Sequence, residues 1–377
     1  MSAPLHIEHL VIGGGAMGLA TTWHLAARGH QVRLLERFEP HHTRGASHGS
    51  TRNLNNAYDE AAYLDLFDEA VTLWRRLEAE SGQQLLGLHG LVTHGDDHVV
   101  ASAHDALVAR GAAVSLLSAS DAAERWSGMR FAGNVLHSRE AGIVHAARAL
   151  AALEDGAIRN GAIVERGERV LDIAPFADGS GARVRTEGPD GVRELTADRV
   201  TVTAGAWAHT LLDGVIELPQ LTVTEEHPAH FAARSAALVW PSFNHMLPES
   251  LLAEYPAPVY GMPSPGEGVK VGFHAVGDIV DPDARRFRAS DAQRDTLRRY
   301  VAEWFPGLDP ETPAEISCTY TSTASSRFVL DTVGPITVGA GFSGHGFKFV
   351  PAIGRVLADA ASGRQAPPEF FRLSAHR

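Results

Sequence analysis

The length, composition and charge of the chain bound its class. Its 377 residues are 44% hydrophobic and 21% charged, and two domains are expected because one hydrophobic core stops growing at roughly 250 to 300 residues. The formal net charge of −12 argues against nucleic acid as a partner. A single cysteine, Cys318, excludes an intrachain disulfide and a thiolate metal cluster, and no metal-ligand spacing is present. The single cysteine fits a reducing, cytoplasmic compartment best. We see no secretion signal at the N-terminus, and no apolar run is long enough to cross a membrane.

The first 36 residues predict a βαβ unit. Residues 6–12 have the length and apolar content of a strand, an alanine-rich helical stretch follows, and residues 31–36 form a second strand. Between the first strand and the helix stand Gly13, Gly15 and Gly18, in the spacing Gly-x-Gly-x-x-Gly. In dinucleotide-binding folds the first glycine permits a tight turn, the second lets a pyrophosphate approach the backbone, and the third lets helix and strand pack closely.

An acidic residue ends the second strand at about the spacing that such a fold requires. The carboxylate of Glu36 is expected to bind the ribose hydroxyls of adenosine, and the free N–H groups at the helix N-terminus are expected to hold the phosphates. Ala16 and Met17 at the helix start, and Arg37 after the strand, belong to the same predicted site. The motif fits FAD and NAD equally well, so it leaves the cofactor open.

The remaining elements predict an interleaved α/β architecture. Helices are expected over residues 58–80, 145–160 and 351–361, and strands over residues 163–173, 182–186, 192–202 and 335–340. Residues 188–191 have hairpin turn chemistry, and Ser290 with Gln293 resembles a capping box that begins another helix. A clean linker is missing. The predicted organisation is a discontinuous nucleotide-binding domain of residues 1–85, 145–215 and 318–377, interleaved with a mixed β-sheet (α+β) substrate domain of residues 86–144 and 216–317.

Three later segments favour a flavin over a nicotinamide. Residues 48–52 place a cation in a polar loop after the second strand, and residues 203–207 place small side chains directly after a later strand. Residues 341–349, Gly-Phe-Ser-Gly-His-Gly-Phe-Lys-Phe, join a strand to the last helix and add the ammonium of Lys348. Backbone N–H groups, the helix dipole and this lysine provide positive potential, which stabilises the negative charge of a reduced flavin.

Together these motifs resemble the monomeric sarcosine oxidase and N-methyltryptophan oxidase family, within the D-amino-acid oxidase superfamily. The resemblance runs nearly end to end, through the Gly13 fingerprint, His48-Gly-x-Thr-Arg52, Ala204-Gly-Ala-Trp207, Tyr260-Gly, Lys270-x-Gly-x-His274, Cys318-x-Tyr320 and the 341–349 segment. It implies a Rossmann-type FAD-binding domain and oxidation of a small secondary amine or N-methyl amino acid. A hydride would pass to the flavin, O2 would reoxidise the flavin to give H2O2, and the product imine would hydrolyse. The resemblance also implies a monomer whose partners are the amine and O2.

Roles for single residues follow from the same resemblance. Cys318 matches a cysteine that forms a thioether to the flavin, Lys270 a lysine that activates oxygen, and Lys348 a cation that holds the substrate carboxylate. His274 lies four residues after Lys270 and is expected to line the same cavity. The predicted catalytic residues are Lys270, Arg52, His274, Lys348, Tyr260 and Tyr320. The predicted cofactor-binding residues are Gly13, Gly15, Ala16, Met17, Gly18, Glu36, Arg37, His48, Thr51, Arg52, Val170, Ala204, Trp207, Cys318, Gly344, His345, Gly346 and Lys348.

The sequence departs from the family at two places. Asn55 stands where the family has a second carboxylate-binding arginine, and a neutral amide cannot give the charge-assisted, bidentate grip of a guanidinium. Glu225 and Glu226 stand where relatives tend to be basic. Four alternatives stay open: a dehydrogenase of the same fold that uses an acceptor other than oxygen, an oxidase of an amine without a carboxylate, an NAD-dependent dehydrogenase, and a non-catalytic flavin-binding protein.

Overall fold

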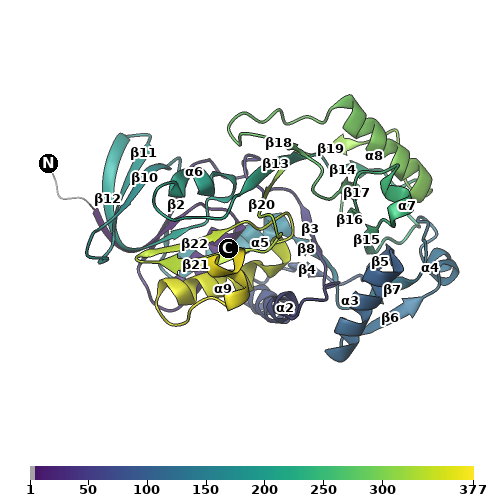
Figure 1. The fold of residues 1–377 in the computed structure, drawn as a ribbon, viewed down its shortest axis with the longest axis horizontal. Helices are drawn as coiled ribbons and strands as arrows, with labels where there is room; N and C mark the ends of the chain where they lie inside the picture. The colour runs from purple at the N-terminus through teal and green to yellow at the C-terminus, as the bar shows by residue number, and fades with distance from the viewer. Residues whose placement is uncertain (1–4) are drawn as a thin grey trace.

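The computed structural model describes residues 5–377, which form two large β-sheets placed along the long axis of the molecule (Figure 1). In the first sheet five strands run parallel in the order β9, β2, β1, β12 and β22. Its antiparallel strands all lie on the β12 side, where β11 pairs with β12 and β10, and β21 pairs with β22, whereas β9 forms the opposite edge. Its strands are β1 (Leu5–Ile12), β2 (Val32–Glu36), β9 (Ile163–Arg166), β10 (Arg169–Pro175), β11 (Ala182–Gly188), β12 (Gly191–Val202), β21 (Val329–Val333) and β22 (Ile336–Ala340).

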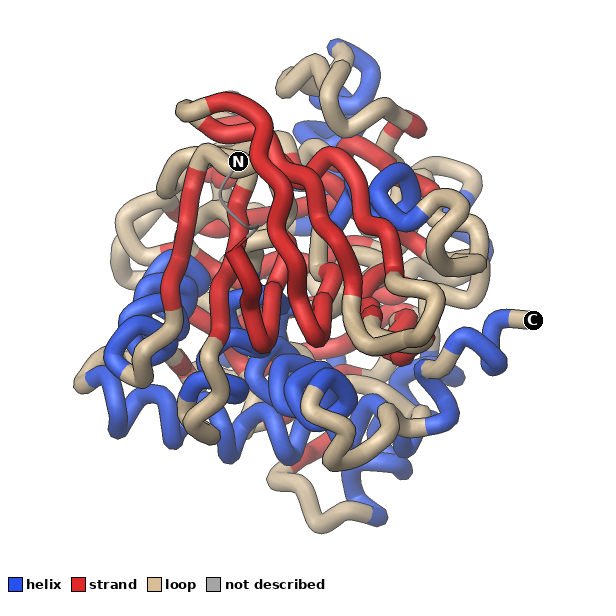
Figure 2. The backbone as a smooth tube through the Cα atoms, turned by 90° about the vertical axis from the view of Figure 1, so that its left-hand side faces the viewer, coloured by secondary structure: helices blue, strands red, loops and turns tan. Residues whose placement is uncertain are grey.

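Side-chain alternation along the central strand β1 places apolar groups on both faces of this sheet. Val11 joins the core beneath the helices, whereas Leu10 and Ile12 join the core on the opposite face. The strands are therefore buried on both sides, as parallel sheets require. Helices pack along one side of the sheet (Figure 2). They are α1 (Ala16–Ala26), α2 (Ala61–Ser81), α5 (Ala146–Arg159) and α9 (Val350–Ala361).

The second large sheet is mostly antiparallel, except that β5 and β15 run parallel. Its strands, in spatial order, are β19 (Ala314–Glu315), β14 (Ala229–Phe231), β17 (Gly268–Phe273), β16 (Val259–Ser264), β15 (Ser242–Met246), β5 (Leu91–Gly95), β7 (Val135–Ser138) and β6 (Val114–Leu117). The helices near it are α3 (Asp97–Ala109), α4 (Ala119–Arg125), α7 (Glu249–Leu252) and α8 (Asp291–Trp304). The capping box predicted at Ser290 and Gln293 is confirmed at the start of α8.

Two small antiparallel sheets connect the large ones. They contain β3 (Thr51–Leu54), β8 (Gly142–His145) and β4 (Leu86–Gly87) in one, and β18 (Asp278–Ile279), β13 (Thr222–Glu226) and β20 (Cys318–Ser322) in the other. The remaining short helices are η1 (Gly205–Trp207), α6 (Ala208–Leu212), η2 (Phe347–Phe349), η3 (Glu369–Phe371) and η4 (Leu373–His376).

The predicted fold class, an α/β nucleotide-binding fold joined to a mixed sheet, is confirmed. The first sheet takes all its strands from residues 1–85, 145–215 and 318–377, and the second takes all its strands from the intervening residues. This distribution supports the proposed domain division, which stays a prediction. The single strand expected over residues 163–173 was wrong, because Gly167 has a φ of +72° and separates β9 from β10. The hairpin turn at 188–191 is confirmed. None of the helices formed by residues 5–377 has the length and hydropathy needed to cross a bilayer.

Candidate functional site

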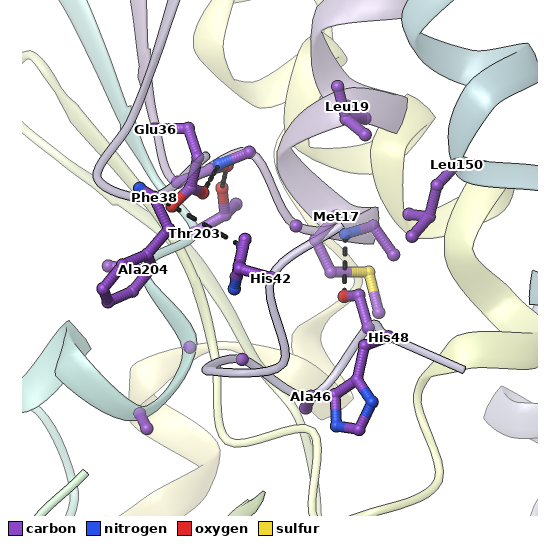
Figure 3. A pocket seen from close by; sticks show the side chains of 18 of the residues that line it. Met17, Leu19, Glu36, Phe38, His42, Ala46, His48, Leu150, Thr203 and Ala204 are labelled. Atoms are coloured by element: carbon purple, nitrogen blue, oxygen red, sulfur yellow. Dashed lines mark hydrogen bonds and ion pairs between the residues drawn. The ribbon is translucent and has the colours of Figure 1, made fainter. Parts of the chain in front are cut away.

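A cavity of about 880 Å³ extends from the glycine-rich turn after β1 to strand β20. Its size is in the upper part of the range of roughly 300 to 1,000 Å³ that is usual for small-molecule sites. Its wall combines the C-terminal ends of β1 and β2, the loop 45–52, the segment 203–207 and the segment 341–347. Polar and apolar side chains from these separate segments face it together (Figure 3).

The glycine-rich turn has the geometry that its motif predicts. Gly13 has a φ of +101°, and a Cβ there would lie 2.6 Å from the carbonyl oxygen of Thr203. A Cβ at Gly18 would overlap the carbonyl oxygen of Gly13, so α1 packs against this turn more closely than a side chain permits. The helix begins at Ala16 after the N-cap residue Gly15, which makes no side-chain cap, and its N-terminus faces the cavity with a partial positive charge.

Two backbone N–H groups fix the carboxylate of Glu36 at the cavity wall. Its Oε2 accepts from the N–H of Gly14 at 2.7 Å, and its Oε1 accepts from the N–H of Phe38 at 2.9 Å. The Nε2 atom of His42 lies 3.8 Å from the same carboxylate (Figure 3). A buried acceptor is thus held in place before any ligand arrives.

Ser47 is a contact of the helix N-terminus that the sequence analysis missed. Its Oγ accepts from the N–H of Ala16 at 3.0 Å, and the residue lines the cavity. This bond fastens the loop 45–52 to the start of α1. A serine shortly before the His48 motif was the only available signal, because the contact joins residues 31 positions apart.

Arg52 is held as a fixed cation at the cavity wall. Its guanidinium donates to the carbonyl oxygens of Thr51 at 2.8 Å, Ala46 at 2.8 Å and His48 at 2.5 Å. It also lies 5.5 Å from the ring centroid of Phe347. Because all three acceptors are neutral carbonyls, its charge is available to a ligand in the cavity.

His48 faces the cavity as a neutral imidazole. Burial and the nearby cations Arg52, Lys270 and Arg285 lower the pKa of His48 to about 4. Its Nε2 atom is buried and has no hydrogen-bond partner among the described residues. A buried nitrogen without a partner at a cavity wall indicates a ligand group that completes it.

Cys318 is the first residue of β20 and lines the same cavity. Its Sγ lies 3.9 Å from the carbonyl oxygen of Ala46, in the loop that carries His48 and Arg52. In the antiparallel pairing of β13 with β20, Glu226 stands opposite Cys318. The thiol therefore lies between the 45–52 loop and the small sheet formed by β18, β13 and β20.

Lys270 lies in β17 between His230 of β14 and Met262 of β16. Its side chain is buried, and burial together with the neighbouring guanidinium of Arg52 lowers the pKa of Lys270 to about 7. A buried ammonium next to a second cation is well suited to attract an anion.

A second buried lysine, Lys348 of η2, has only neutral hydrogen-bond acceptors. Its Nζ donates to the hydroxyl oxygen of Tyr58 at 2.8 Å and to the carbonyl oxygen of His345 at 2.6 Å. Burial lowers the pKa of Lys348 to about 7. Among residues 5–377, burial is the one cause found for this lowering, and no carboxylate charge opposes it. Tyr58 was missed by the sequence analysis, since it lies 290 positions from Lys348.

Aromatic side chains gather beside these lysines. The ring centroid of His274 lies 5.3 Å from that of Tyr320 and 6.3 Å from that of Tyr260. Burial, and then the charge of Lys348, lower the pKa of His274 to about 4, and burial raises the pKa of Tyr260 to about 12. Gly344 has a φ of +74°, and a Cβ there would overlap the ring of Tyr320. The fold thus brings β16, β17, β20 and the 341–349 segment together.

The predicted site residues fall into two groups. Those that line the cavity are Gly13, Gly15, Ala16, Met17, Glu36, Arg37, His48, Arg52, Val170, Ala204, Trp207, Cys318, Tyr320, Gly344 and Gly346. Those outside its lining are Gly18, Thr51, Tyr260, Lys270, His274, His345 and Lys348. The side chain of Asn55 is engaged locally, because its Oδ1 accepts from the N–H of Ala57 at 2.8 Å.

One cluster outside the cavity has ligand atoms close enough for a metal ion, namely Glu8, His9 and His30, whose atoms lie within 4.8 Å of one another. The Nδ1 of His30 lies 2.7 Å from the carboxylate of Glu8, and a second oxygen of Glu8 accepts from the N–H of Gln31. These are ordinary polar contacts, and none of the three residues lines the cavity.

Comparisons with known proteins show the family of the chain. The family model described as DAO, FAD dependent oxidoreductase, matches residues 8–360. The monomeric sarcosine oxidase of Bacillus sp. (strain B-0618) is 31% identical over 375 residues, covering 94% of this chain and 92% of that protein. The peroxisomal sarcosine oxidase of Homo sapiens is 33% identical, with 93% and 90% covered.

Among solved structures, a variant of NikD, described as an unusual amino acid oxidase essential for nikkomycin biosynthesis, superposes with a TM-score of 0.86. It is 26% identical and covers 98% of this chain and 97% of its own. The fingerprint alone left FAD and NAD open, and the family match resolves that choice in favour of FAD. The chain belongs to the DAO family of FAD-dependent oxidoreductases.

Proposed function

We propose that this enzyme oxidises an N-methyl amino acid, or a similar small secondary amine with a carboxylate, and uses O2 as the electron acceptor. The relatives named above as sarcosine oxidases support this substrate class. The observation that carries the proposal is Lys348, a buried ammonium that has only neutral partners and lies close to His274. A substrate carboxylate would supply the missing negative charge.

The residues of the cavity fit FAD. Glu36 is oriented to accept from ribose hydroxyls. Ser47 accepts from the N–H of Ala16, and the other N–H groups in the first turn of α1 are offered to a pyrophosphate. The unpartnered Nε2 of His48 and the fixed guanidinium of Arg52 face the other end of the cavity, beside Cys318. When bound there, FAD supplies a ring that accepts a hydride equivalent and returns electrons to O2.

Substrate residues act by position and by excluding water. Lys348 binds the carboxylate, while the rings of Tyr260, His274 and Tyr320 enclose the amine and its methyl group. The depressed pKa of His274 keeps this imidazole neutral above about pH 4, so it adds no positive charge that would repel a protonated amine. Loss of a hydride from the carbon next to nitrogen requires the free amine, and the nearby ammonium of Lys348 favours that neutral form.

The two cations at the other side of the site favour negative charge. Lys270 and Arg52 are close enough that the charge of Arg52 lowers the pKa of Lys270, and both cations stabilise anionic species that form during electron transfer. Superoxide, the first product of electron transfer to O2, is such an anion. The imine formed from the amine then hydrolyses in water. Reduction of O2 by two electrons gives H2O2.

We also propose that Cys318 binds the flavin covalently. Support comes from its place in the cavity wall beside the loop that carries His48 and Arg52. Acid-precipitated protein should remain yellow, and Cys318→Ala should release the colour into the supernatant. Colour lost from the unmutated protein would exclude a covalent bond but leave amine oxidation untouched.

The test of the substrate class is anaerobic bleaching of the flavin band by a panel of amines. Sarcosine and other N-methyl amino acids should bleach it, whereas N-methylethylamine, which lacks a carboxylate, should bleach it far more slowly. The reverse order would favour an oxidase of simple amines. One observation supports that alternative: Asn55 replaces a carboxylate-binding arginine, and its Oδ1 accepts from the N–H of Ala57. Stoichiometric H2O2 on admitting air distinguishes an oxidase from a dehydrogenase that uses another acceptor.

A monomer is proposed from relatives that are named monomeric, and a cytoplasmic location from the single cysteine. Light scattering during size-exclusion chromatography tests the first, and fractionation of the source cells tests the second.

A further inference from the structure

Arg285 is a fully buried arginine that joins four segments of the chain. Its guanidinium donates to the carbonyl oxygens of Arg44 at 2.7 Å and Thr43 at 3.4 Å, and to the Oγ of Ser317 at 2.7 Å. Its Nε lies 3.5 Å from Oε1 of Glu225, and both side chains of this ion pair are at most 3% exposed. One side chain therefore connects the segment after β18, the 43–48 loop, β13 and the residue before Cys318.

The same arrangement explains the acidic pair of β13. Glu225 accepts from the Oγ of Ser317 at 2.5 Å and from the N–H groups of Arg286 and Phe287 at 3.1 and 2.8 Å. Glu226 accepts from the N–H of Gly277 at 3.1 Å. Neither carboxylate is left for a ligand, so the two residues serve the fold around Cys318.

The groups connected by Arg285 are those that decide where the thiol of Cys318 lies. Ser317 precedes Cys318 directly, and Glu226 stands opposite Cys318 in the register of β13 with β20. On the other side, the 43–48 loop carries the carbonyl of Ala46, 3.9 Å from Sγ, and is fastened to α1 by Ser47. Arg285 therefore contacts both the residue before the thiol and the loop that borders the cavity.

A gain in folding stability does not by itself explain the buried ion pair of Arg285 and Glu225. Two charges removed from water lose about as much solvation as they gain from each other, and apolar replacements of buried pairs are often neutral or stabilising. Bond formation, in contrast, needs reacting atoms about 3 to 3.5 Å apart, and a displacement of about 1 Å can cost about 100-fold in rate.

We propose that Arg285, with Glu225 as its partner, is the positioning residue for covalent attachment of the flavin at Cys318. This inference rests on the covalent bond proposed above. In that reaction the sulfur of Cys318 joins the 8α-carbon of the ring. The thiol hydrogen and one methyl hydrogen move with two electrons onto the ring, which becomes reduced, and O2 then removes both as H2O2. Arg285 touches neither reacting atom. It acts by holding Ser317 and the 43–48 loop at a fixed position relative to each other.

The test compares flavin attachment with flavin binding in the full-length chain. Arg285→Met combined with Glu225→Met removes the pair without leaving a lone buried charge. The apoprotein variant, incubated with FAD in air, should bind flavin as measured by fluorescence quenching. Its rate of attachment, followed as fluorescence retained by acid-denatured protein on a gel, should fall by about 10- to 100-fold. Arg285→Lys, which keeps the charge and shortens the reach, should recover part of that rate.

Arg28→Met is a matched control. It removes another largely buried ion pair, with Asp359, and leaves Asp359 paired with Arg355. Neither Arg28 nor Asp359 lines the cavity, so attachment should proceed at the unmutated rate. If the double variant fails to fold, Glu225→Gln replaces it, which keeps the shape of the Glu225 side chain and removes only its charge.

The inference would be overturned if flavin attached at the unmutated rate both in Arg285→Lys and in the double variant, or in Glu225→Gln where the double variant does not fold. So would a loss of attachment that only follows an equal loss of FAD binding. An unmutated enzyme that bleaches with amines yet releases all its flavin in acid would overturn this inference while leaving the proposed oxidation intact.

Discussion

The Nζ of Lys348 lies 2.8 Å from the hydroxyl oxygen of Tyr58, and this bond is the first step of a chain of hydrogen bonds. Since the lysine donates to that oxygen, the Tyr58 hydroxyl is free to donate to Nδ1 of His345, 3.1 Å away. The Nε2 of His345 then donates to the carbonyl oxygen of Ser326 at 3.1 Å. The buried ammonium is therefore oriented by a network whose members are all neutral.

Tyr58→Phe removes the oxygen that receives the ammonium and keeps the ring. A hydrogen bond to a charged group contributes roughly 1.5 to 3 kcal/mol, so the KM for N-methyl amino acids should rise about 10- to 100-fold. The KM for an amine without a carboxylate should stay constant. Tyr63→Phe is the matched control, because Tyr63 belongs to the same aromatic cluster and its hydroxyl makes only a 3.4 Å contact with Ser326. Equal effects of the two changes on KM would contradict the role given to Tyr58.

The pKa of Lys348 predicts how carboxylate binding depends on pH. Burial lowers this pKa to about 7, and only the protonated lysine attracts an anion. Affinity for acetate, a carboxylate without an amine, should therefore be constant below pH 7 and fall up to tenfold per pH unit above it. Titration of the flavin spectrum with acetate at pH 6 and pH 9 should give dissociation constants that differ on the order of 100-fold.

Lys348→Met should weaken acetate binding at pH 6 and remove this dependence. Lys270→Met should retain the dependence, which separates the two lysines whose pKa values are both lowered to about 7. A dependence that persists in Lys348→Met would assign it to another group.

Lys270→Met also tests the reaction with oxygen. The change removes a buried cation beside Arg52, and fixed charges of this kind are worth on the order of 100- to 1,000-fold in rate where negative charge develops. Stopped-flow measurement should show reoxidation of the reduced flavin slowed by about that factor, with reduction by substrate slowed much less. Lys270→Arg should recover part of the oxygen reaction, and equal slowing of both half-reactions would contradict the assignment.

Local sequence signals predicted the nucleotide half of the site, because Gly13 and Glu36 belong to one βαβ unit of about 30 residues. The contacts of Ser47, Tyr58 and Arg285 could not be predicted in that way. They join residues 31 to 290 positions apart, and such pairings depend on how the sheets meet. Glu225 and Glu226 were recognisable as a departure from the family, but their partners become clear only from the register of β13 with β20.

The second sheet contains a pair of buried histidines that predicts sensitivity to acid. The rings of His94 and His245 stack 4.2 Å apart, and Nδ1 of His245 accepts from the hydroxyl of Tyr300 at 2.7 Å. Burial lowers the pKa of His245 to about 4, whereas the unfolded chain keeps a value near 6.5. Between these values the unfolded state binds more protons, so the free energy of unfolding falls as pH falls below about 6.5.

For His245 alone this loss amounts to about 2 kcal/mol at pH 5 relative to pH 7.5. His245→Leu combined with Tyr300→Phe removes the titrating ring without leaving the hydroxyl unpaired. Urea unfolding at the two pH values should show that the difference in unfolding free energy shrinks by about this amount in the double variant. Tyr300→Phe alone should keep the full difference, and an unchanged difference in the double variant would show that His245 is not protonated on unfolding.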